Sequence, residues 1–273
     1  MENLIRAFER HLIEEEKSSI TIEKYMRDVR KFCSFAGRQD ITKEVVIHYK
    51  KHLVEVGYAV RSINSMLASL NHFLEYSGLK EYKVKSMKMQ KQIYCKEDKE
   101  LTKAEYIRLL STAKSQPRLY YVMQTICGTG IRVSELSYFT VEAVKRGEIV
   151  VSCKNKTRTI LLPRKLQKEL LHYAQKARIK TGIIFRTRSG KALDRSNIWS
   201  EMKKLCQDAK VSATKVFPHN LRKLFARTFY KIEKDIAKLA DILGHGSIDT
   251  TRIYIISTGT EHRRKIENLG LVV

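Results

Sequence analysis

The chain has 273 residues, of which 43% are hydrophobic, and it carries a formal net charge of +24 at pH 7. This length allows one large domain or two modest ones, and the hydrophobic content is ordinary for a soluble globular protein. No apolar run approaches the ~20 residues that a membrane-spanning helix needs, and the charge excess indicates a polyanionic partner, most often nucleic acid.

The first 79 residues predict a small bundle of four short helices. Apolar side chains between residues 22 and 33 recur at three- and four-residue spacing, which places them on one helical face, and Gly37 follows as a stop signal. Further helices are expected over about Thr42–Glu55 and Val60–Tyr76, where the apolar positions again form one stripe.

Residues 80–100 differ in character, because seven lysines interrupt a segment with little apolar periodicity. We interpret this stretch as a basic linker. A basic linker between two lobes suits a clamp that closes around a DNA duplex, and a solvated loop without such a role is the alternative.

Residues 101–273 predict a mostly helical domain with a small sheet. Two β-branched, apolar runs at residues 148–153 and 157–162 are joined by Lys154-Asn155-Lys156, which indicates a β-hairpin. A short strand is expected at Ile183–Phe185. Helices are expected at 103–114, with a capping box at its start, at 117–127, after Pro163, and near 194–209, 219–231, 233–243 and 248–256.

The positive charge is concentrated in this second part. Residues 101–273 carry a net charge of +20, whereas residues 1–79 carry +1, which favours binding of nucleic-acid phosphates by the second part. The five cysteines have no spacing suited to a zinc site, and the N-terminus lacks a signal-peptide pattern. Both observations are typical of a cytoplasmic protein.

One arginine of the second part lies in a glycine-rich turn. Arg132 follows Gly128-Thr-Gly130, where a turn is predicted to become a helix, and a guanidinium can donate two parallel hydrogen bonds to one phosphate. Glu135, three residues on, could pair with a basic partner and fix its orientation. Taken alone, an arginine after Gly-x-Gly is more often a surface residue, and Glu135 could equally be an exposed carboxylate.

A second group of polar side chains follows near the C-terminal end. His219 and Arg222 are three residues apart on a predicted helix, so both point to one side. His245 directly follows Gly244 at the end of the next predicted helix, and Tyr254 comes nine residues later. Each residue alone has a simpler structural explanation, but together they could hold and attack a phosphodiester.

The order of these motifs resembles the tyrosine recombinase (phage integrase) family. Residues 128–136 (GTGIRVSEL) and 243–254 (LGHGSIDTTRIY) look like the two signature boxes of that family. The resemblance covers the whole chain and is closest to the two-domain, Xer-type members. It implies a mainly α fold, with a helical, SAM-like core DNA-binding domain at 1–79, the basic linker at 80–100, and at 101–273 a mixed α/β, mostly helical catalytic domain with a β-hairpin and a C-terminal tail.

The resemblance implies a role for each matching residue in holding the phosphate. Arg132 and Arg222 would clamp the scissile phosphate between them. His219 would assist proton transfer and phosphate binding, and His245 would hydrogen-bond a non-bridging oxygen.

It also implies the residues that make and break bonds. Tyr254 would attack the phosphorus and become joined to the DNA 3′-phosphate. Lys154, at the end of the first hairpin strand, would protonate the departing 5′-oxygen, and Lys156 is the alternative for that role. Cationic neighbours favour the phenolate form of a tyrosine, which agrees independently with these roles.

The implied function is site-specific DNA recombination or integration, as in mobile elements, through a 3′-phosphotyrosyl intermediate and a Holliday junction, without metal, cofactor or ATP. The expected partners are double-stranded recombination sites, with a homotetramer in the synaptic complex and a monomer when free. A sequence-specific DNA-binding protein with an inactive relic site, or a topoisomerase or telomere-resolving enzyme, is the alternative.

Three features of the sequence leave geometric questions open. Lys223 stands where the family usually has a small or polar residue, and Tyr230–Asp235 lacks the glycine often found between these two helices. The tail after Tyr254 could dock on a neighbouring subunit or fold back on its own domain.

Overall fold

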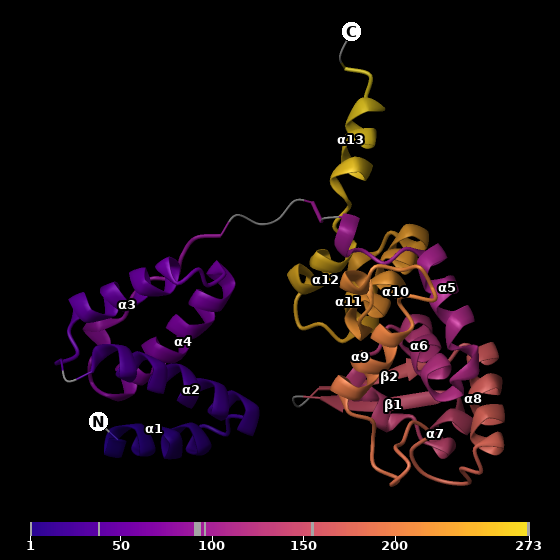
Figure 1. Cartoon of the computed structure of the whole chain (residues 1–273), viewed down its shortest axis with the longest axis horizontal. Coiled ribbons are helices and arrows are strands. Elements are labelled where there is room, and N and C mark those ends of the chain that lie inside the picture. Colours follow the sequence, from indigo (N-terminus) through magenta and orange to yellow (C-terminus); the bar gives the residue numbers. More distant parts are fainter. Residues whose placement is uncertain (1, 38, 90–93, 96, 154–155, 272–273) are drawn as a thin grey trace. The chain divides into compact units, whose positions relative to one another are not determined.

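The computed structural model describes residues 2–37, 39–89, 94–95, 97–153 and 156–271. The chain divides into two compact units, residues 1–91 and 92–273, which are described separately (Figure 1). Among the described residues, no helix has the combination of length and apolar character that a bilayer crossing requires.

The first unit is a bundle of four helices, as predicted. The helices are α1 (Glu2–Glu14), α2 (Ser19–Ala36), α3 (Lys43–Glu55) and α4 (Val60–Tyr76). Their apolar stripes meet in one core, in which the rings of Phe8, Phe32 and Phe73 are fully buried. Gly37 ends α2 at a positive φ of 63°, and its N–H donates to the Cys33 carbonyl. The glycine stop signal is therefore confirmed.

The segment after α4 packs along this bundle. It begins with a short 3₁₀ helix, η1 (Lys80–Tyr82). The Asn71 side chain bonds both backbone groups of Val84, at 2.9 and 3.0 Å, and Asn64 does the same with Met87, at 3.0 and 2.7 Å. Two asparagines therefore fasten the chain to the bundle beyond residue 79.

The second unit is mostly helical with one two-stranded sheet, which confirms the predicted fold class. Its α-helices are α5 (Lys103–Thr112), α6 (Pro117–Thr129), α7 (Val141–Arg146), α8 (Arg164–Lys176), α9 (Arg195–Lys204), α10 (Pro218–Glu233), α11 (Ile236–Leu243), α12 (Ile248–Ile255) and α13 (Gly259–Glu267). Short 3₁₀ helices are η2 (Glu97–Lys99), η3 (Ala113–Ser115), η4 (Val133–Tyr138) and η5 (Ala213–Lys215). The predicted capping box is present, since Thr102 and Glu105 bond each other's backbone N–H groups at the start of α5.

The sheet differs from the prediction in its turn. Strands β1 (Glu148–Cys153) and β2 (Lys156–Leu161) are antiparallel, and Cys153 pairs with Lys156. Lys156 is therefore part of the second strand, and the predicted three-residue connection is one residue too long. The predicted strand at Ile183–Phe185 is wrong, because in the described residues it makes only an isolated bridge to Thr140. Its apolar character reflects burial of Ile184 and Phe185 in the core.

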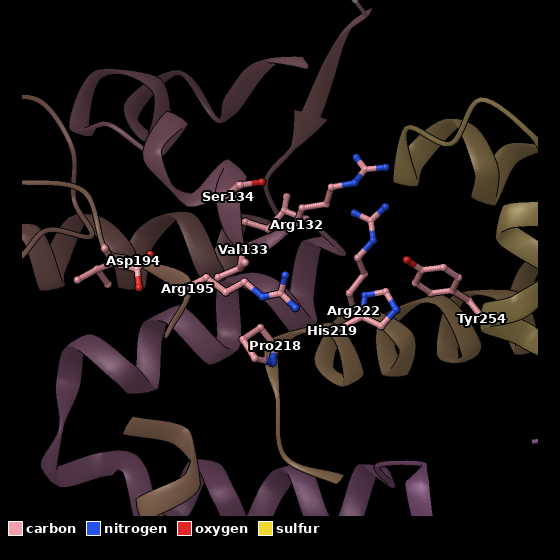
Figure 2. Close-up of a pocket in the computed structure, with 11 residues that line it drawn as sticks. Arg132, Val133, Ser134, Asp194, Arg195, Pro218, His219, Arg222 and Tyr254 are labelled. Carbon is pink, nitrogen blue, oxygen red and sulfur yellow. The ribbon is translucent and has the colours of Figure 1, made fainter. Parts of the chain in front are cut away.

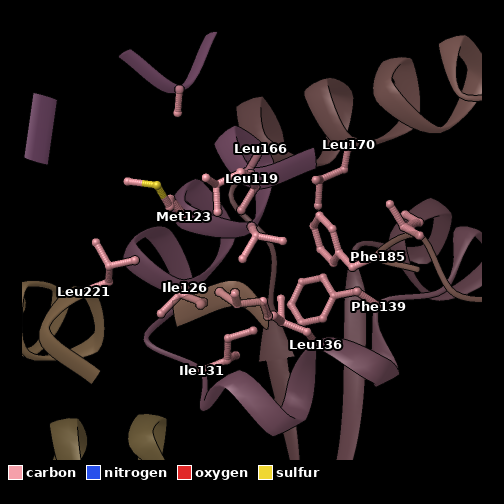
Figure 3. Close-up of a cluster of buried hydrophobic side chains, with 14 of the residues drawn as sticks. Leu119, Met123, Ile126, Ile131, Leu136, Phe139, Leu166, Leu170, Phe185 and Leu221 are labelled. Atoms are coloured by element: carbon pink, nitrogen blue, oxygen red, sulfur yellow. The ribbon is translucent and has the colours of Figure 1, made fainter. Parts of the chain in front are cut away.

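The core of the second unit holds α10 in place. Leu119, Met123 and Ile126 on the buried face of α6 lie in one cluster with Leu221 of α10 (Figure 3). Leu221 is fully buried, so α10 cannot rotate without opening this core. The packing therefore fixes the direction in which the neighbouring side chains of α10 point.

The start of the tail docks on its own unit. The Cys95 N–H donates to the Ser257 carbonyl at 3.1 Å, and Arg227 of α10 pairs with Glu261 of α13 at 3.0 Å. No described residue of α13 is buried, and Ile266 is 53% exposed. The base of the tail thus contacts its own unit, while Ile266 of α13 and the following Leu269 and Leu271 are exposed to solvent.

The missing glycine after α10 is replaced by a strained lysine. Lys234 ends α10 with φ 58° and ψ 4°, in the left-handed region that favours glycine. We expect Lys234→Gly to raise the free energy of unfolding by about 1 kcal/mol. Urea denaturation followed by fluorescence of Trp199, the single tryptophan, measures this in the second unit. As a control, Lys168→Gly inside α8 should lower the free energy of unfolding by about 1 kcal/mol. If Lys234→Gly also lowered it, the backbone of Lys234 would not be strained.

Candidate active site

Most of the predicted site residues line one pocket of the second unit, with a volume of about 430 Å³ (Figure 2). They come from the turn before η4, from α10 and from α12. The lining residues are Ile131, Arg132, Val133, Ser134, Leu193, Asp194, Arg195, Pro218, His219, Arg222 and Tyr254.

Arg222 is the most deeply buried of these cations, with 1% of its surface exposed. Its Nη1 donates to the Gly130 carbonyl at 2.5 Å, its Nη2 donates to the Leu243 carbonyl at 2.7 Å, and Nη2 lies 2.9 Å from His245 Nε2. Burial and the nearby Arg132 lower the pKa of Arg222 to about 10, so it remains charged at neutral pH. Backbone carbonyls thus hold one guanidinium rigidly at the pocket.

Arg132 lies at the N-terminal end of η4 and is held by a buried carboxylate. Its Nη1 pairs with Glu135 Oε1 at 3.1 Å, its backbone N–H donates to Glu135 Oε2 at 2.7 Å, and its Nη2 donates to the Gly244 carbonyl at 3.0 Å. The expected pairing of Glu135 with a basic residue is confirmed, and Glu135 is only 3% exposed. The Arg132 side chain remains 36% exposed, so it can still reach a ligand in the pocket.

Two glycines allow the segments to approach this closely. Gly130 has a φ of 67°, and a Cβ there would lie 2.3 Å from Phe225 Cδ1. Gly244 has a φ of 64°, and a Cβ there would lie 2.7 Å from Arg158 Cδ. Since both carbonyls accept from the site arginines, the glycines of the two motifs serve close backbone packing around the guanidinium groups.

The Tyr254 ring lies between two imidazoles. Its centroid is 5.1 Å from that of His219 and 5.0 Å from that of His245, and the Arg222 Cζ is 5.8 Å from it. Figure 2 shows the hydroxyl end of Tyr254 turned toward the guanidinium groups of Arg132 and Arg222. The ring is 9% exposed and packs with Leu239 in a small apolar cluster, which fixes its position.

The histidines are neutral at physiological pH. Burial lowers the pKa of His219 to about 4, with a further contribution from the cationic Lys223 and Arg222. Burial followed by Arg222 and Arg132 lowers the pKa of His245 to about 4. His245 Nδ1 lies 2.8 Å from the Thr251 hydroxyl, which orients the ring.

Comparison with known proteins places the chain in a family. The sequence pattern of the phage integrase family matches residues 99–261, and that of the phage integrase N-terminal SAM-like domain matches residues 5–79. Tyrosine recombinase XerA of Thermococcus kodakarensis is 31% identical over 280 residues, covering 99% of this chain and 96% of that protein. The chain belongs to the phage integrase family of tyrosine recombinases.

Further relatives and solved structures agree with this family. Tyrosine recombinase XerD of Halalkalibacterium halodurans is 26% identical, covering 92% of this chain and 91% of its own. A crystal structure of XerA recombinase is 25% identical with a TM-score of 0.54, covering 98% of both chains. A lambda integrase (75–356) dimer bound to a COC′ core site shares the fold at 18% identity, with a TM-score of 0.75 and coverage of 95% and 96%.

The structure of this tyrosine recombinase brings together Arg132, His219, Arg222, His245 and Tyr254. Lys154, the predicted general acid, lies outside the described residues. The alternative Lys156 begins β2.

Sequence reasoning missed Arg158 and Arg195. Arg195, at the start of α9, lines the pocket (Figure 2). Arg158 belongs to β2, and its Nη2 lies 2.7 Å from Glu135 Oε2. A signal for Arg158 existed, because it lies two residues before the buried Ile160 and therefore shares the inward face of the strand, where a cation is unusual.

One group of residues described in this recombinase has the side chains and spacing to hold a metal ion, and it lies in the first unit. His11, Glu15 and His72 offer ligand atoms within 4.8 Å of one another. The Glu15 carboxylate bonds His72 at 2.8 Å. Behind the pocket, both oxygens of Glu135 bond arginines, and Asp194 at the pocket wall caps α9 by accepting from the Ser196 N–H.

The depressed pKa values of His219 and His245 predict acid-sensitive stability of this recombinase. Both imidazoles take up protons near pH 6.5 when unfolded but only near pH 4 when folded. The unfolded state therefore binds more protons between these values, so the free energy of unfolding is constant above about pH 6.5 and falls as the pH decreases toward 4. Urea titrations followed by Trp199 fluorescence at pH 7.5, 6.0 and 5.0 measure this.

A double substitution distinguishes the contribution of these two histidines to the pH dependence from that of other titrating groups. In the double variant His219→Gln, His245→Gln the decline between pH 6.5 and 5 should be clearly smaller, whereas His172→Gln outside the pocket should keep it. An unchanged decline in the double variant would show that other groups cause it.

Proposed function

We propose that this protein is a site-specific DNA recombinase that cleaves and rejoins DNA through a covalent 3′-phosphotyrosyl intermediate. The observation that supports this most directly is the position of Tyr254, between two neutral imidazoles and facing two guanidinium groups. A phosphodiester in the pocket would lie between the phenol and the arginines.

Arg132 and Arg222, which we call the phosphate clamp, would bind the two non-bridging oxygens of the scissile phosphate. Charge accumulates on these oxygens as the phosphorus becomes five-coordinate, and donors fixed in advance stabilise it most effectively. Arg222 is held by two carbonyls and Arg132 by Glu135, so neither has to reorganise during the reaction.

Attack requires removal of the phenol proton. A free tyrosine has a pKa near 10 and is a poor nucleophile until its anion is stabilised. Neutral His219 can accept that proton. In the free chain His245 Nε2 accepts from Arg222 Nη2, so His245 would donate a hydrogen bond to a non-bridging oxygen after the phosphate takes over this donor and the imidazole changes its tautomer. Lys154, with Lys156 as the alternative, would protonate the departing 5′-oxygen.

The resulting tyrosyl linkage conserves the bond energy, so strand exchange through a Holliday junction needs no ATP. The two arginines would stabilise the negative charge on the phosphate oxygens, so we propose that the reaction needs no metal ion either. We propose double-stranded recombination sites as the substrate, residues 1–79 as the core-binding domain, and residues 80–100 as the basic linker to the catalytic domain at 101–273. The net charge of +20 on residues 101–273 supports phosphate binding.

We propose a monomer when free and a homotetramer in the synaptic complex. A lambda integrase tetramer bound to a Holliday junction has the same fold, with a TM-score of 0.73, which supports this assembly. The exposed apolar side chains of the tail, Ile266 in α13 and Leu269 and Leu271 after it, are available for contacts between subunits.

Covalent capture tests the proposal. The purified chain is incubated in EDTA with a library of duplexes that carry a randomised segment and a nick, so that a cleaved strand escapes and the adduct accumulates. We expect a DNA-linked band on a denaturing gel, whose captured DNA shares one sequence. Binding without any covalent band would favour the inactive relic, and adducts without strand exchange between two such sites would favour a topoisomerase.

A further inference from the structure

We propose that Arg158 is a positioning residue that keeps the phosphate clamp cationic. This inference rests on the proposed function and adds a residue to it. Arg158 belongs to β2, opposite Val151 in β1, and its side chain is 15% exposed. It does not line the pocket, so its effect must pass through the groups that it contacts.

The first contact is with Glu135. Arg158 Nη2 pairs with Glu135 Oε2 at 2.7 Å, while Oε1 of the same carboxylate pairs with Arg132 at 3.1 Å. One buried carboxylate thus serves two guanidinium groups. Without Arg158, Glu135 would keep only its two contacts with Arg132, to the backbone N–H and to Nη1. The whole carboxylate charge would then be balanced by Arg132 alone, which would weaken the attraction of that arginine for a phosphate.

The charge balance shows why this matters. Arg132, Arg158, Arg222 and Glu135 together carry a net charge of +2, and both neighbouring histidines are neutral at pH 7. The phosphodiester carries one negative charge, and the five-coordinate transition state carries more on its oxygens. Removing Arg158 lowers the local charge to +1, which weakens the site mainly in the transition state.

The second contact is with the Leu-Gly-His turn. The Arg158 side chain lies so close to Gly244 that an added Cβ would be 2.7 Å from its Cδ and Nε. The Gly244 carbonyl accepts from Arg132, and the next residue is His245. Arg158 therefore packs against the turn that contains the Gly244 carbonyl, which accepts from Arg132, and the His245 imidazole.

The remaining donors of Arg158 argue against a purely structural role. Its Nε and Nη1 are buried and have no hydrogen-bond partner among the described residues. Buried donors without partners cost stability, so an apolar side chain of similar length would suit the fold better. Stability sacrificed beside a reaction site is typical of a functional residue.

The test compares Arg158→Met, Arg158→Lys and the control Arg164→Met, which removes an equal charge from the exposed start of α8. With the captured duplex, we expect Arg158→Met to form adduct about 10²-fold more slowly at an affinity for DNA within about threefold of wild type. Arg158→Lys should recover most of the rate because it restores the charge, and Arg164→Met should be unchanged.

A neutral methylphosphonate at the scissile position distinguishes an electrostatic effect of Arg158 from a structural one. It lacks one non-bridging oxygen, so its five-coordinate transition state carries one negative charge fewer. Arg158→Met should therefore lower the rate clearly less on this substrate than on the ordinary duplex. An equal loss on both substrates would mean a structural role only and would overturn the inference, as would an unchanged rate on the ordinary duplex. Failure of the wild-type chain to form any adduct would instead refute the proposed function.

Gly244 provides a second measurement. Gly244→Ala should slow adduct formation, because its Cβ displaces Arg158 and because φ at this position is 64°. Adding Arg158→Met to Gly244→Ala should lower the rate less than it does in the wild-type background. Fully additive losses would contradict a shared mechanism.

Discussion

Tyr254→Phe is expected to abolish covalent adduct formation while DNA affinity stays within about threefold of wild type. The substitution removes a single oxygen, and the ring that packs with Leu239 and lies between the two imidazoles is retained. No other group can replace the phenol as nucleophile, so the loss should be complete within detection. Gel shift and denaturing electrophoresis on the captured duplex measure the two properties separately.

A nearby tyrosine serves as the control for this substitution. Tyr230 lies on α10 and packs against the same small apolar cluster, so Tyr230→Phe makes an identical chemical change in a similar environment. We expect Tyr230→Phe to form adduct at the wild-type rate. An adduct that persists in Tyr254→Phe and disappears in Tyr230→Phe would reassign the nucleophile.

Arg222 substitutions should produce the second large effect. Arg222→Lys keeps the charge but cannot form the same two hydrogen bonds to the Gly130 and Leu243 carbonyls and still present a fixed donor to phosphate. We expect the rate of adduct formation to fall about 10²–10³-fold, and Arg222→Ala to be at least as slow. DNA affinity should change little, since it is spread over many phosphate contacts.

Stability has to be measured alongside, because Arg222 is 1% exposed. Arg222→Ala leaves two buried carbonyls without a donor, which should cost a few kcal/mol, whereas Arg222→Lys should be milder. Trp199 fluorescence in urea shows whether each variant is folded under assay conditions. A folded variant whose affinity and cleavage fall by the same factor would make Arg222 a general DNA contact only.

Local sequence patterns predicted the elements that carry the site. α10 begins at Pro218, one residue before the predicted start, the Leu-Gly-His segment ends α11, and Ser247 caps α12 by accepting from the Asp249 N–H. These signals act over a few residues and need no tertiary information. The order of the motifs then predicted convergence of the side chains.

Contacts between distant segments could not be predicted in the same way. The approach of Arg158 to Gly244 joins residues 86 positions apart, and it depends on the register of a hairpin whose turn was predicted one residue too long. Strand alternation places Arg158 on the same face as Ile160, but which residues of another segment it meets there depends on how the hairpin packs against the Leu-Gly-His turn. Local patterns do not determine that packing. Likewise, a lysine gives no indication of a left-handed backbone conformation, so the positive φ of Lys234 could not be predicted.

Mass spectrometry of the adduct can show whether the Tyr254 oxygen becomes bonded to a DNA 3′-phosphate. Trypsin cuts after Arg252 and Arg263, so the intervening peptide contains Tyr254 as its single tyrosine. We predict that this peptide carries the mass of a nucleotide 3′-phosphate on Tyr254 and that the released strand ends in a 5′-hydroxyl. Linkage through another residue would mean that Tyr254 is not the nucleophile, and linkage to a 5′-phosphate would mean a different cleavage polarity.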